Sequence, residues 1–377
     1  MKISITEHFE ELEDPRQEGK IEHKLEDILL LCISAIICGA EGWHDIEIFG
    51  QARLDWLKKH GDFEYGIPVD DTIARVMSAL NPKQLQTCFV NWMKAASDVS
   101  QGDIVSIDGK TVRHSFDRKN KKRAIHMVSA FARKNGVVLA QKKTVEKSNE
   151  IIAIPELLEL LDLHGCIVTI DAMGCQHKIA ETIIDKKADY VLMVKQNQGK
   201  LYEDIKDFFD ICHQENFKQV SFDYYEQVDK QHGRFEIRRY WISSTLETIR
   251  NTDNWKGIKT IGMVESERHV GDKVTRDTRY YMNSIPLQAK TFAKAVRGHW
   301  GIENSLHWTL DMTFREDESR IRRDNAAEVL AVFRHIALNT IRQEKSCKKS
   351  IKAKRYKATL EPAYMDKLMQ PLIHGVS

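Results

Sequence analysis

The chain is poor in cysteine, proline and glycine. Its 377 residues include 7 cysteines, 7 prolines and 19 glycines. The cysteines are scattered, odd in number and form no Cys-x-x-Cys pair, which argues against a disulfide scaffold and a zinc ribbon. This usage is typical of a protein of the reducing cytoplasm.

Long hydrophobic runs are also missing. The most apolar segment, ILLLCISAIIC at 28–38, is about half the length of a membrane span. The N-terminal MKISITEHFEELEDPRQ is acidic and lacks the apolar core of a signal peptide. We therefore expect no membrane partner and interpret 28–38 as a buried helix.

A large excess of one charge is absent as well. Lys plus Arg is 57 and Asp plus Glu is 55, and 42% of residues are hydrophobic, which is typical of a soluble globular chain with two or three modules. The basic residues are nevertheless concentrated in two tracts, 110–147 and 342–357. Such tracts favour a polyanion surface, although a solvated face explains them equally well.

Hydrophobic periodicity divides the chain into a helical first part and a mixed second part. The sequence predicts N-terminal helices at 25–38, 43–59, 71–80 and 83–97. The helix that carries Thr72 and Arg75 follows another helix after a turn, which is compatible with helix-turn-helix DNA reading. Simple packing helices are the commoner outcome.

From residue 101 the pattern predicts an α/β fold, a mixed sheet flanked by helices. The expected order is strands at 103–110, 125–132 and 137–144, a helix at 149–163, a strand at 166–172, a helix at 177–188 and a strand at 190–195. We expect these domain segments: 1–98 helical and DNA-binding, 99–199 and 288–345 catalytic, 200–287 a β-rich insertion, and 346–377 a basic C-terminal tail.

Two aspartates stand at the ends of apolar strands with nearly the same local sequence. Asp108 closes IVSID and Asp171 closes IVTID. A carboxylate at the end of a buried strand is costly unless it is paired or bound to metal. A turn or N-cap aspartate is the ordinary alternative for each one. Two in one predicted sheet favour convergence of the carboxylates if their strands are neighbours.

A third carboxylate lies in the predicted helix HWGIENSLHWTLD, 299–311. His299, Glu303, His307 and Asp311 recur every four residues, so we expect them on one helix face. Oxygen ligands suit Mg²⁺ or Mn²⁺, and two ions roughly 3.5 to 4 Å apart serve phosphoryl transfer. Zinc held by His299 with His307, or by Cys166 with Cys175, lacks a recognised ligand spacing.

Long stretches of the sequence strongly resemble the DDE transposases of bacterial insertion sequences, specifically the H-repeat-associated proteins found with Rhs elements. They include IPVDDTIARV, IDGKTVRHS, EKSNEIIAIPELL, TIDAMGCQ, KQNQG and GHWGIENSLHWTLDMTFREDESRIRRDNAAE. The resemblance implies a ribonuclease-H-like catalytic core and a metal-binding catalytic triad of Asp108, Asp171 and Glu303. It also implies hydrolysis and strand transfer at element ends, double-stranded DNA as partner, a homodimer on DNA, and nucleoid association.

The resemblance departs from related transposases around the glutamate. Their Tyr, Arg and Lys correspond here to Val296, His299 and Leu310, which puts hairpin chemistry in doubt and leaves His299 and Arg297 as phosphate-side partners. The remaining expected DNA contacts are Lys110, Arg113, Lys121, Lys122, Arg123 and Lys195. A catalytically silent DNA-binding relic is the alternative function. A two-carboxylate glycosidase fits less well, because Lys and Arg surround Asp108.

Overall fold

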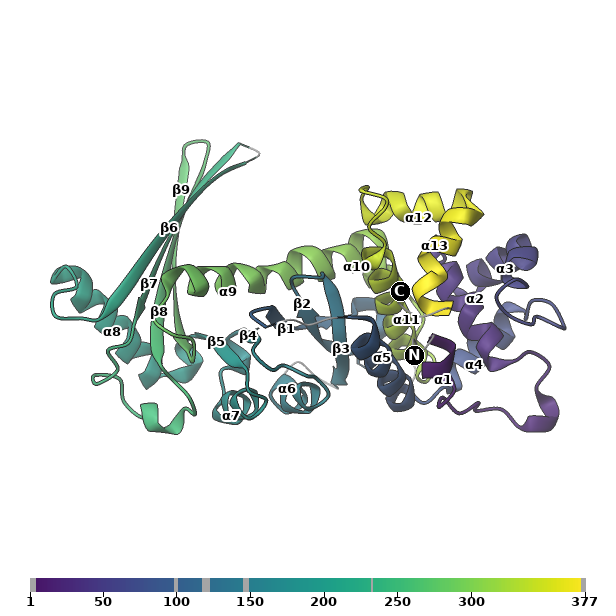
Figure 1. Ribbon diagram of the computed structural model, residues 1–377, viewed down its shortest axis with the longest axis horizontal. Helices are drawn as coiled ribbons and strands as arrows, with labels where there is room; N and C mark the ends of the chain where they lie inside the picture. The colour runs from purple at the N-terminus through teal and green to yellow at the C-terminus, as the bar shows by residue number, and fades with distance from the viewer. Residues whose placement is uncertain (1–4, 98–100, 117–122, 145–148, 232, 374–377) are drawn as a thin grey trace. The chain divides into compact units, whose positions relative to one another are not determined.

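The computed structural model describes residues 5–97, 101–116, 123–144, 149–231 and 233–373 (Figure 1). The chain forms two compact units, and each contains more than one stretch of sequence. The first unit comprises Met1–Asp98, Gly109–Asn149 and Glu303–Ser377. The second comprises Val99–Asp108 and Glu150–Ile302.

The first unit is mainly helical, with a two-stranded hairpin. Its helices are α1 (Ile5–Phe9), α2 (Leu25–Cys38), α3 (Trp43–Leu57), α4 (Asp70–Ala79), α5 (Pro82–Ala96), α10 (Trp308–Thr313), α11 (Ala326–Gln343), α12 (Ile351–Leu360) and α13 (Pro362–Ile373). The hairpin consists of β2 (His126–Ala132) and β3 (Val137–Thr144). The four helices predicted before residue 98 are confirmed to within about two residues.

Helix α11 forms the centre of this unit. Fifteen of the sixteen residues from Ala326 to Ile341 are buried, all except Glu328, as is the α2 segment from Ile28 to Ile37. The Asn339 amide is also buried, and it donates to the backbone oxygen of Val138 at 2.8 Å while accepting from the Val138 N–H at 2.9 Å. A buried polar group needs such partners, and this pair fixes β3 against α11.

The segment expected as a basic tail instead forms α12 and α13. Arg355 is buried, donates to the backbone oxygens of Ile36 and Thr313, and lies over the Phe314 ring at 4.2 Å. Lys354 is buried and donates to the oxygen of Ile341 at 3.1 Å. Both cations satisfy carbonyls at helix ends. The basic tract 342–357 therefore contains buried cations that stabilise the fold, such as Lys354 and Arg355. A count of charges along the sequence cannot distinguish them from cations on the surface.

The second unit is an α/β unit built on one continuous sheet. Its strands follow the order β1-β4-β5-β9-β8-β7-β6, and the last residues of β1 (Ile104–Thr111) belong to the first unit. The other strands are β4 (Ile167–Ile170), β5 (Asp189–Val194), β6 (Phe222–Gln231), β7 (Arg234–Ser243), β8 (Thr260–Val270) and β9 (Lys273–Asn283). Strands β1, β4 and β5 are parallel, and the rest are antiparallel.

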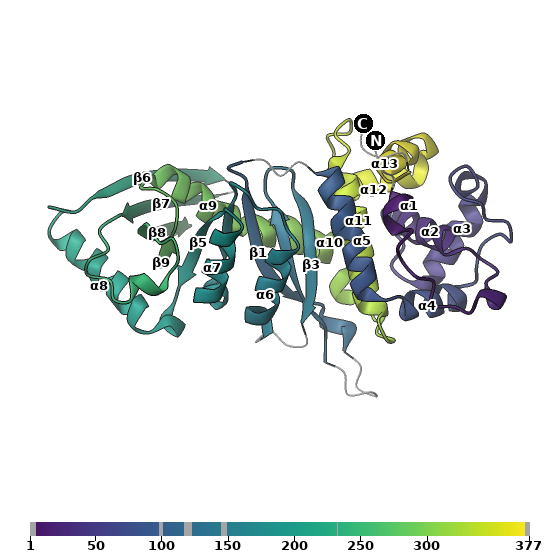
Figure 2. The same cartoon turned by 60° about the horizontal axis from the view of Figure 1, so that its bottom comes forward.

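The expected β-rich insertion extends the central sheet. It begins with helix α8 (Lys200–Gln214) and ends with β9, which pairs with β5 from Val191↔Asn283 to Val194↔Tyr280. Helix α9 (Ala289–Gly301) covers one face of the sheet, and α6 (Glu150–Glu159) and α7 (His177–Asp185) cover the other (Figures 1 and 2). The unit is therefore a mixed sheet between helices, as predicted.

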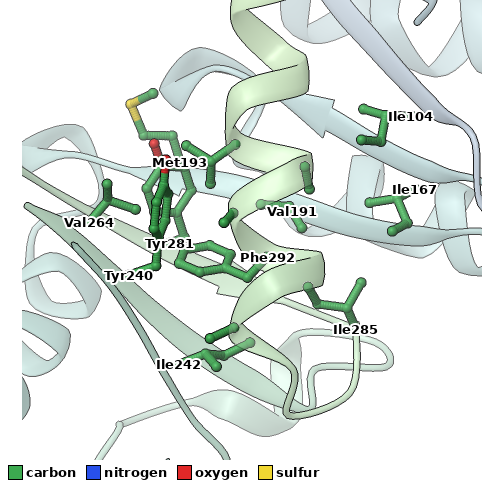
Figure 3. Packing of buried hydrophobic residues seen from close by; sticks show 14 of the residues in the cluster. Ile104, Ile167, Val191, Met193, Tyr240, Ile242, Val264, Tyr281, Ile285 and Phe292 are labelled. Carbon is green, nitrogen blue, oxygen red and sulfur yellow. The ribbon is translucent and has the colours of Figure 1, made fainter. Parts of the chain in front are cut away.

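Aromatic packing under α9 fixes this helix on the sheet. Phe292 of α9 meets Tyr281 at a centroid distance of 5.3 Å and Tyr240 at 6.2 Å, both edge-on (Figure 3). Its ring lies directly over Gly262, where an added Cβ would come within 2.5 Å of the Phe292 ring. A glycine is required there because the helix approaches the strand so closely.

Candidate active site

Asp108 and Asp171 belong to the second unit. Asp171 directly follows β4 as expected, but Asp108 does not end its strand, because β1 continues to Thr111. Strands β1 and β4 are parallel and in register from Ile104↔Ile167 to Ile107↔Ile170. Asp108 and Asp171 directly follow the last of these pairs, so they lie side by side where β4 ends. Both are partly buried.

Asp171 also forms the turn that follows its strand. Its Oδ1 accepts hydrogen bonds from the backbone N–H groups of Met173 at 3.0 Å and Gly174 at 3.4 Å. The alternative role considered from the sequence, an N-cap, is thus present. These bonds engage one carboxylate oxygen and orient the other, so the cap is compatible with a ligand role.

The KQNQG segment holds this turn from the neighbouring strand. The Asn197 amide donates to the backbone oxygen of Ala172 at 2.9 Å, and the Gln198 amide donates to that of Cys175 at 2.5 Å. Both amides come from the short helix Gln196–Gln198 after β5. The sequence analysis assigned no role to these residues, although the motif was among the resembling stretches.

A buried chain of hydroxyl groups attaches the last turn of α9 to the two strands. The Ser106 hydroxyl donates to the backbone oxygen of Gly298 at 3.2 Å, and the Thr169 hydroxyl donates to Ser106 Oγ at 3.1 Å. Thr169 Oγ1 lies 3.2 Å from His299 Nδ1. Because the Thr169 proton is already used, the imidazole donates from Nδ1.

This arrangement places His299 beside the aspartate pair. Ser106 and Thr169 each precede an aspartate by two residues, and residues two apart on a strand point to the same face. Burial lowers the pKa of His299, and the nearby Asp171 carboxylate partly opposes that shift. The expected role of His299 as a phosphate donor stays a prediction.

Glu303 is the first residue of its segment in the first unit and directly follows Ile302 of the second. It lies in a π-helical stretch, Ile302–His307, and is exposed. The expectation that His299, Glu303, His307 and Asp311 share one helix face stays a prediction. Such π segments are frequent at functional sites.

Lys110 is the centre of an ion-pair cluster in the first unit. Its ammonium lies 2.7 Å from Asp311, 2.8 Å from Glu316 and 3.1 Å from Asp317, and its side chain is 11% exposed. Burial alone would raise the pKa of the fully enclosed Glu316, but Lys110 and Arg334 lower it below its usual value. A DNA contact by Lys110 would require these pairs to break.

The other expected DNA-contact residues differ in accessibility. The Arg113 side chain is 78% exposed and pairs with Asp317 at 3.1 Å. Lys195 and Arg123 are exposed. Arg297 lies 3.5 Å from Asp229. Lys121 and Lys122 lie outside the described residues, so their DNA contact stays a prediction.

The donor chemistry fits a hard divalent ion better than zinc. Two adjacent carboxylates supply the oxygen ligands that Mg²⁺ and Mn²⁺ prefer. Burial raises the pKa of the Cys166 thiol to about 11 and that of Cys175 to about 12, so neither is a ready thiolate ligand. His44, Glu47 and Asp70 form the one three-residue group among the described residues whose ligand atoms all lie within 4.8 Å. The ligand atoms of Asp108, Asp171 and His299 therefore do not all lie within 4.8 Å of one another.

The chain belongs to the family of transposases with a DDE domain. The family model described as "Transposase DDE domain" matches residues 99–340, and the model described as "DDE_Tnp_1-associated" matches residues 6–93. More particularly, it is an H-repeat-associated member, because it is similar over nearly its whole length to proteins that carry this name. The resemblance inferred from the sequence is confirmed.

Two relatives from Escherichia coli illustrate the similarity. "Putative transposase YncI" of strain O157:H7 is 47% identical over 97% of this chain and 94% of its own length. "H repeat-associated putative transposase YhhI" of strain K12 is 45% identical over 96% of each chain. A solved piggyBac transposase synaptic complex with hairpin DNA has a TM-score of 0.47 at 10% identity, covering 96% of this chain and 79% of that one. No helix in the described part of this chain is long and apolar enough to span a membrane.

Proposed function

We propose that this protein is a DNA transposase that cleaves phosphodiester bonds at the ends of its element and transfers the freed 3′ strand to target DNA. The observation that supports the proposal is the parallel register of β1 and β4 in a chain of the DDE transposase family. In that register Ile107 pairs with Ile170, and these residues directly precede Asp108 and Asp171. Side-by-side carboxylates suit a divalent ion at a phosphoryl-transfer site.

The core of the proposed enzyme is ribonuclease-H-like. The chain order supports this assignment: β1 with Asp108, the hairpin strands β2 and β3, helix α6, β4 with Asp171, and a distant helical segment with Glu303. Glu303 completes the proposed triad. It lies in the π-helical stretch Ile302–His307, which directly follows α9 along the chain.

The residues of the site have separate proposed tasks. Bound Mg²⁺ or Mn²⁺, with two ions proposed, would polarise the phosphate and lower the pKa of the attacking water. Asp108 and Asp171 would supply ligand oxygens, and the N–H groups of Met173 and Gly174 keep the Asp171 carboxylate oriented. Exposed Lys195 follows β5 directly, and we assign it to a phosphate of the bound strand.

A labelled duplex that carries the element's own end tests this function. Wild-type protein with Mg²⁺ or Mn²⁺ should nick the duplex and leave a 3′ hydroxyl, and it should join that end to a target duplex. Asp171→Asn should abolish nicking and keep affinity for the duplex, because it removes a ligand charge without adding bulk. Nicking by the variant at the wild-type rate would refute the proposal.

The alternative, a catalytically silent DNA-binding protein, predicts a different outcome of this assay. Wild-type protein would then bind the duplex and leave it uncut with either ion. Light scattering of the same complex would test the proposed homodimer on DNA.

A further inference from the structure

We infer that four arginines of the first unit, Arg113, Arg320, Arg322 and Arg323, form a surface that binds the phosphate backbone of DNA. We call them the arginine surface. Three of them were not among the DNA contacts expected from the sequence. The inference rests on the proposed function, since it names where the chain holds the DNA on which the acidic site would act.

Two segments about 200 residues apart in sequence meet at this surface. The Arg322 guanidinium donates to the backbone oxygen of Phe116 at 3.1 Å and lies over its ring at 5.5 Å. The Arg113 side chain pairs with Asp317 at 3.1 Å, and its backbone N–H donates to that carboxylate at 3.4 Å. The loop after β1 and the loop before α11 therefore present their arginines together.

The loop after β1 is anchored from within. The Ser115 hydroxyl is buried, donates to the backbone oxygen of Val112 at 2.7 Å, and accepts from the Ile125 N–H at 2.8 Å. The Val112 N–H donates to the Ile125 oxygen at 3.0 Å. Arg113 thus projects from a fixed base, which reduces the entropy lost when it is ordered against a ligand.

The acidic residues beneath the surface are already neutralised. Glu316 is 3% exposed and is shared by Lys110 and by Arg334, whose Nη1 lies 3.7 Å away. Asp317 is shared by Lys110 and Arg113. Lys110, Arg334 and Arg113 together supply three positive charges against Asp311, Glu316 and Asp317. The charges of Arg320, Arg322 and Arg323 are therefore not needed to offset these carboxylates.

The exposed counter-charges at the surface are weakly held. Arg323 lies 3.6 Å from Asp324, and their side chains are 70% and 65% exposed. A solvated pair of this kind contributes little free energy, so a phosphate can replace the carboxylate. Arg320 is exposed, and its backbone oxygen accepts from Arg322 Nε at 3.1 Å. A guanidinium binds phosphate in a bidentate manner, which suits a backbone ligand.

Salt dependence of DNA affinity tests the inference. Full-length Arg320→Ser/Arg323→Ser is compared with wild type by fluorescence anisotropy, in EDTA, on an element-end duplex and an unrelated duplex of equal length. Each lost phosphate contact should flatten the slope of log affinity against log salt by about 0.9, or roughly 1.8 for two. Binding to the two duplexes should weaken about equally, because phosphate contacts carry no sequence information.

The control variant Lys187→Ser/Lys218→Ser removes the same charge from exposed sites of the second unit. Its slope should equal the wild-type slope. An arginine variant that also keeps the wild-type slope would overturn the inference. Circular dichroism verifies folding, and the milder Arg320→Gln should flatten the slope by about half as much.

The measurement is independent of the outcome for the proposed function. It uses no divalent ion, so it does not depend on strand cleavage. A flattened slope in a protein that never cuts DNA would leave the arginine surface standing and refute the transposase reaction. An unaltered slope in a protein that does cut DNA would refute only the surface.

Discussion

Replacing Lys110 with Met should strongly destabilise the first unit. The methionine keeps most of the aliphatic stem but leaves Asp311, Glu316 and Asp317 without their shared ammonium. Breaking a buried ion pair from one side costs about 3–5 kcal/mol. We expect a value near 3 kcal/mol, because Arg334 still pairs with Glu316 at 3.7 Å and the Asp311 and Asp317 side chains are 31% and 22% exposed.

The loss should depend on pH in a defined direction. In the wild type the pKa of Glu316 lies below its usual value, because Lys110 and Arg334 outweigh the opposing effect of burial. Its contribution to stability is therefore present above the unfolded-state pKa and is lost as pH falls through the folded-state pKa. Without Lys110, burial outweighs the remaining attraction and raises the pKa of Glu316. Protonation of Glu316 at low pH therefore removes part of the destabilisation of the variant. The difference in free energy of unfolding between the wild type and Lys110→Met, here called the stability gap, should therefore be smaller at about pH 4.5 than at pH 7.

Urea unfolding of both proteins at the two pH values measures the gap. Lys206→Met is the matched control, because Lys206 forms an exposed pair with Asp210 on α8. Its urea midpoint should equal that of the wild type, since a solvated pair contributes little to stability. A loss below about 1 kcal/mol for Lys110→Met, or a gap that widens on acidification, would refute this reasoning.

Two further substitutions test the placement of α9. Thr169→Val removes the hydroxyl that accepts from His299, and should cost about 1–3 kcal/mol in urea unfolding; an unchanged midpoint would show that the hydroxyl does not hold the helix. Gly262→Ala places a methyl group 2.5 Å from the Phe292 ring. It should lower the free energy of unfolding by about 1–3 kcal/mol, which is measured as a lowered melting temperature. Gly301→Ala, with nothing within 4 Å of the added Cβ, is its control, and equal melting shifts for the two would contradict the packing argument.

Much of the sheet was predictable because its strands are short, apolar and bounded by turns. The strands around Asp108 and Asp171 begin and end within a few residues of their expected positions. The sequence left open whether these strands are neighbours, and the structure shows that they are. The extension of the sheet through β9 was not predictable, because strand pairing between β5 and β9 leaves no local signal in either strand.

The supports of the site were less predictable than its carboxylates. Lys110 follows Asp108 by two residues and has the appearance of a phosphate ligand in the sequence, yet its partners lie about 200 residues away along the chain. Glu303 was expected on a regular helix, and the π-helical stretch that carries it has no simple sequence signature. Burial and tertiary contacts decided both outcomes.

Metal affinity tests the central claim, that Asp108 and Asp171 together hold the catalytic ion, most directly. Mn²⁺ binding is measured by calorimetry in a His44→Ala background, which removes the group of His44, Glu47 and Asp70 as a competing site. Asp108→Asn and Asp171→Asn should each weaken Mn²⁺ binding by at least about tenfold, and the double variant should bind no more tightly than either. Wild-type Mn²⁺ affinity in both single variants would contradict the account.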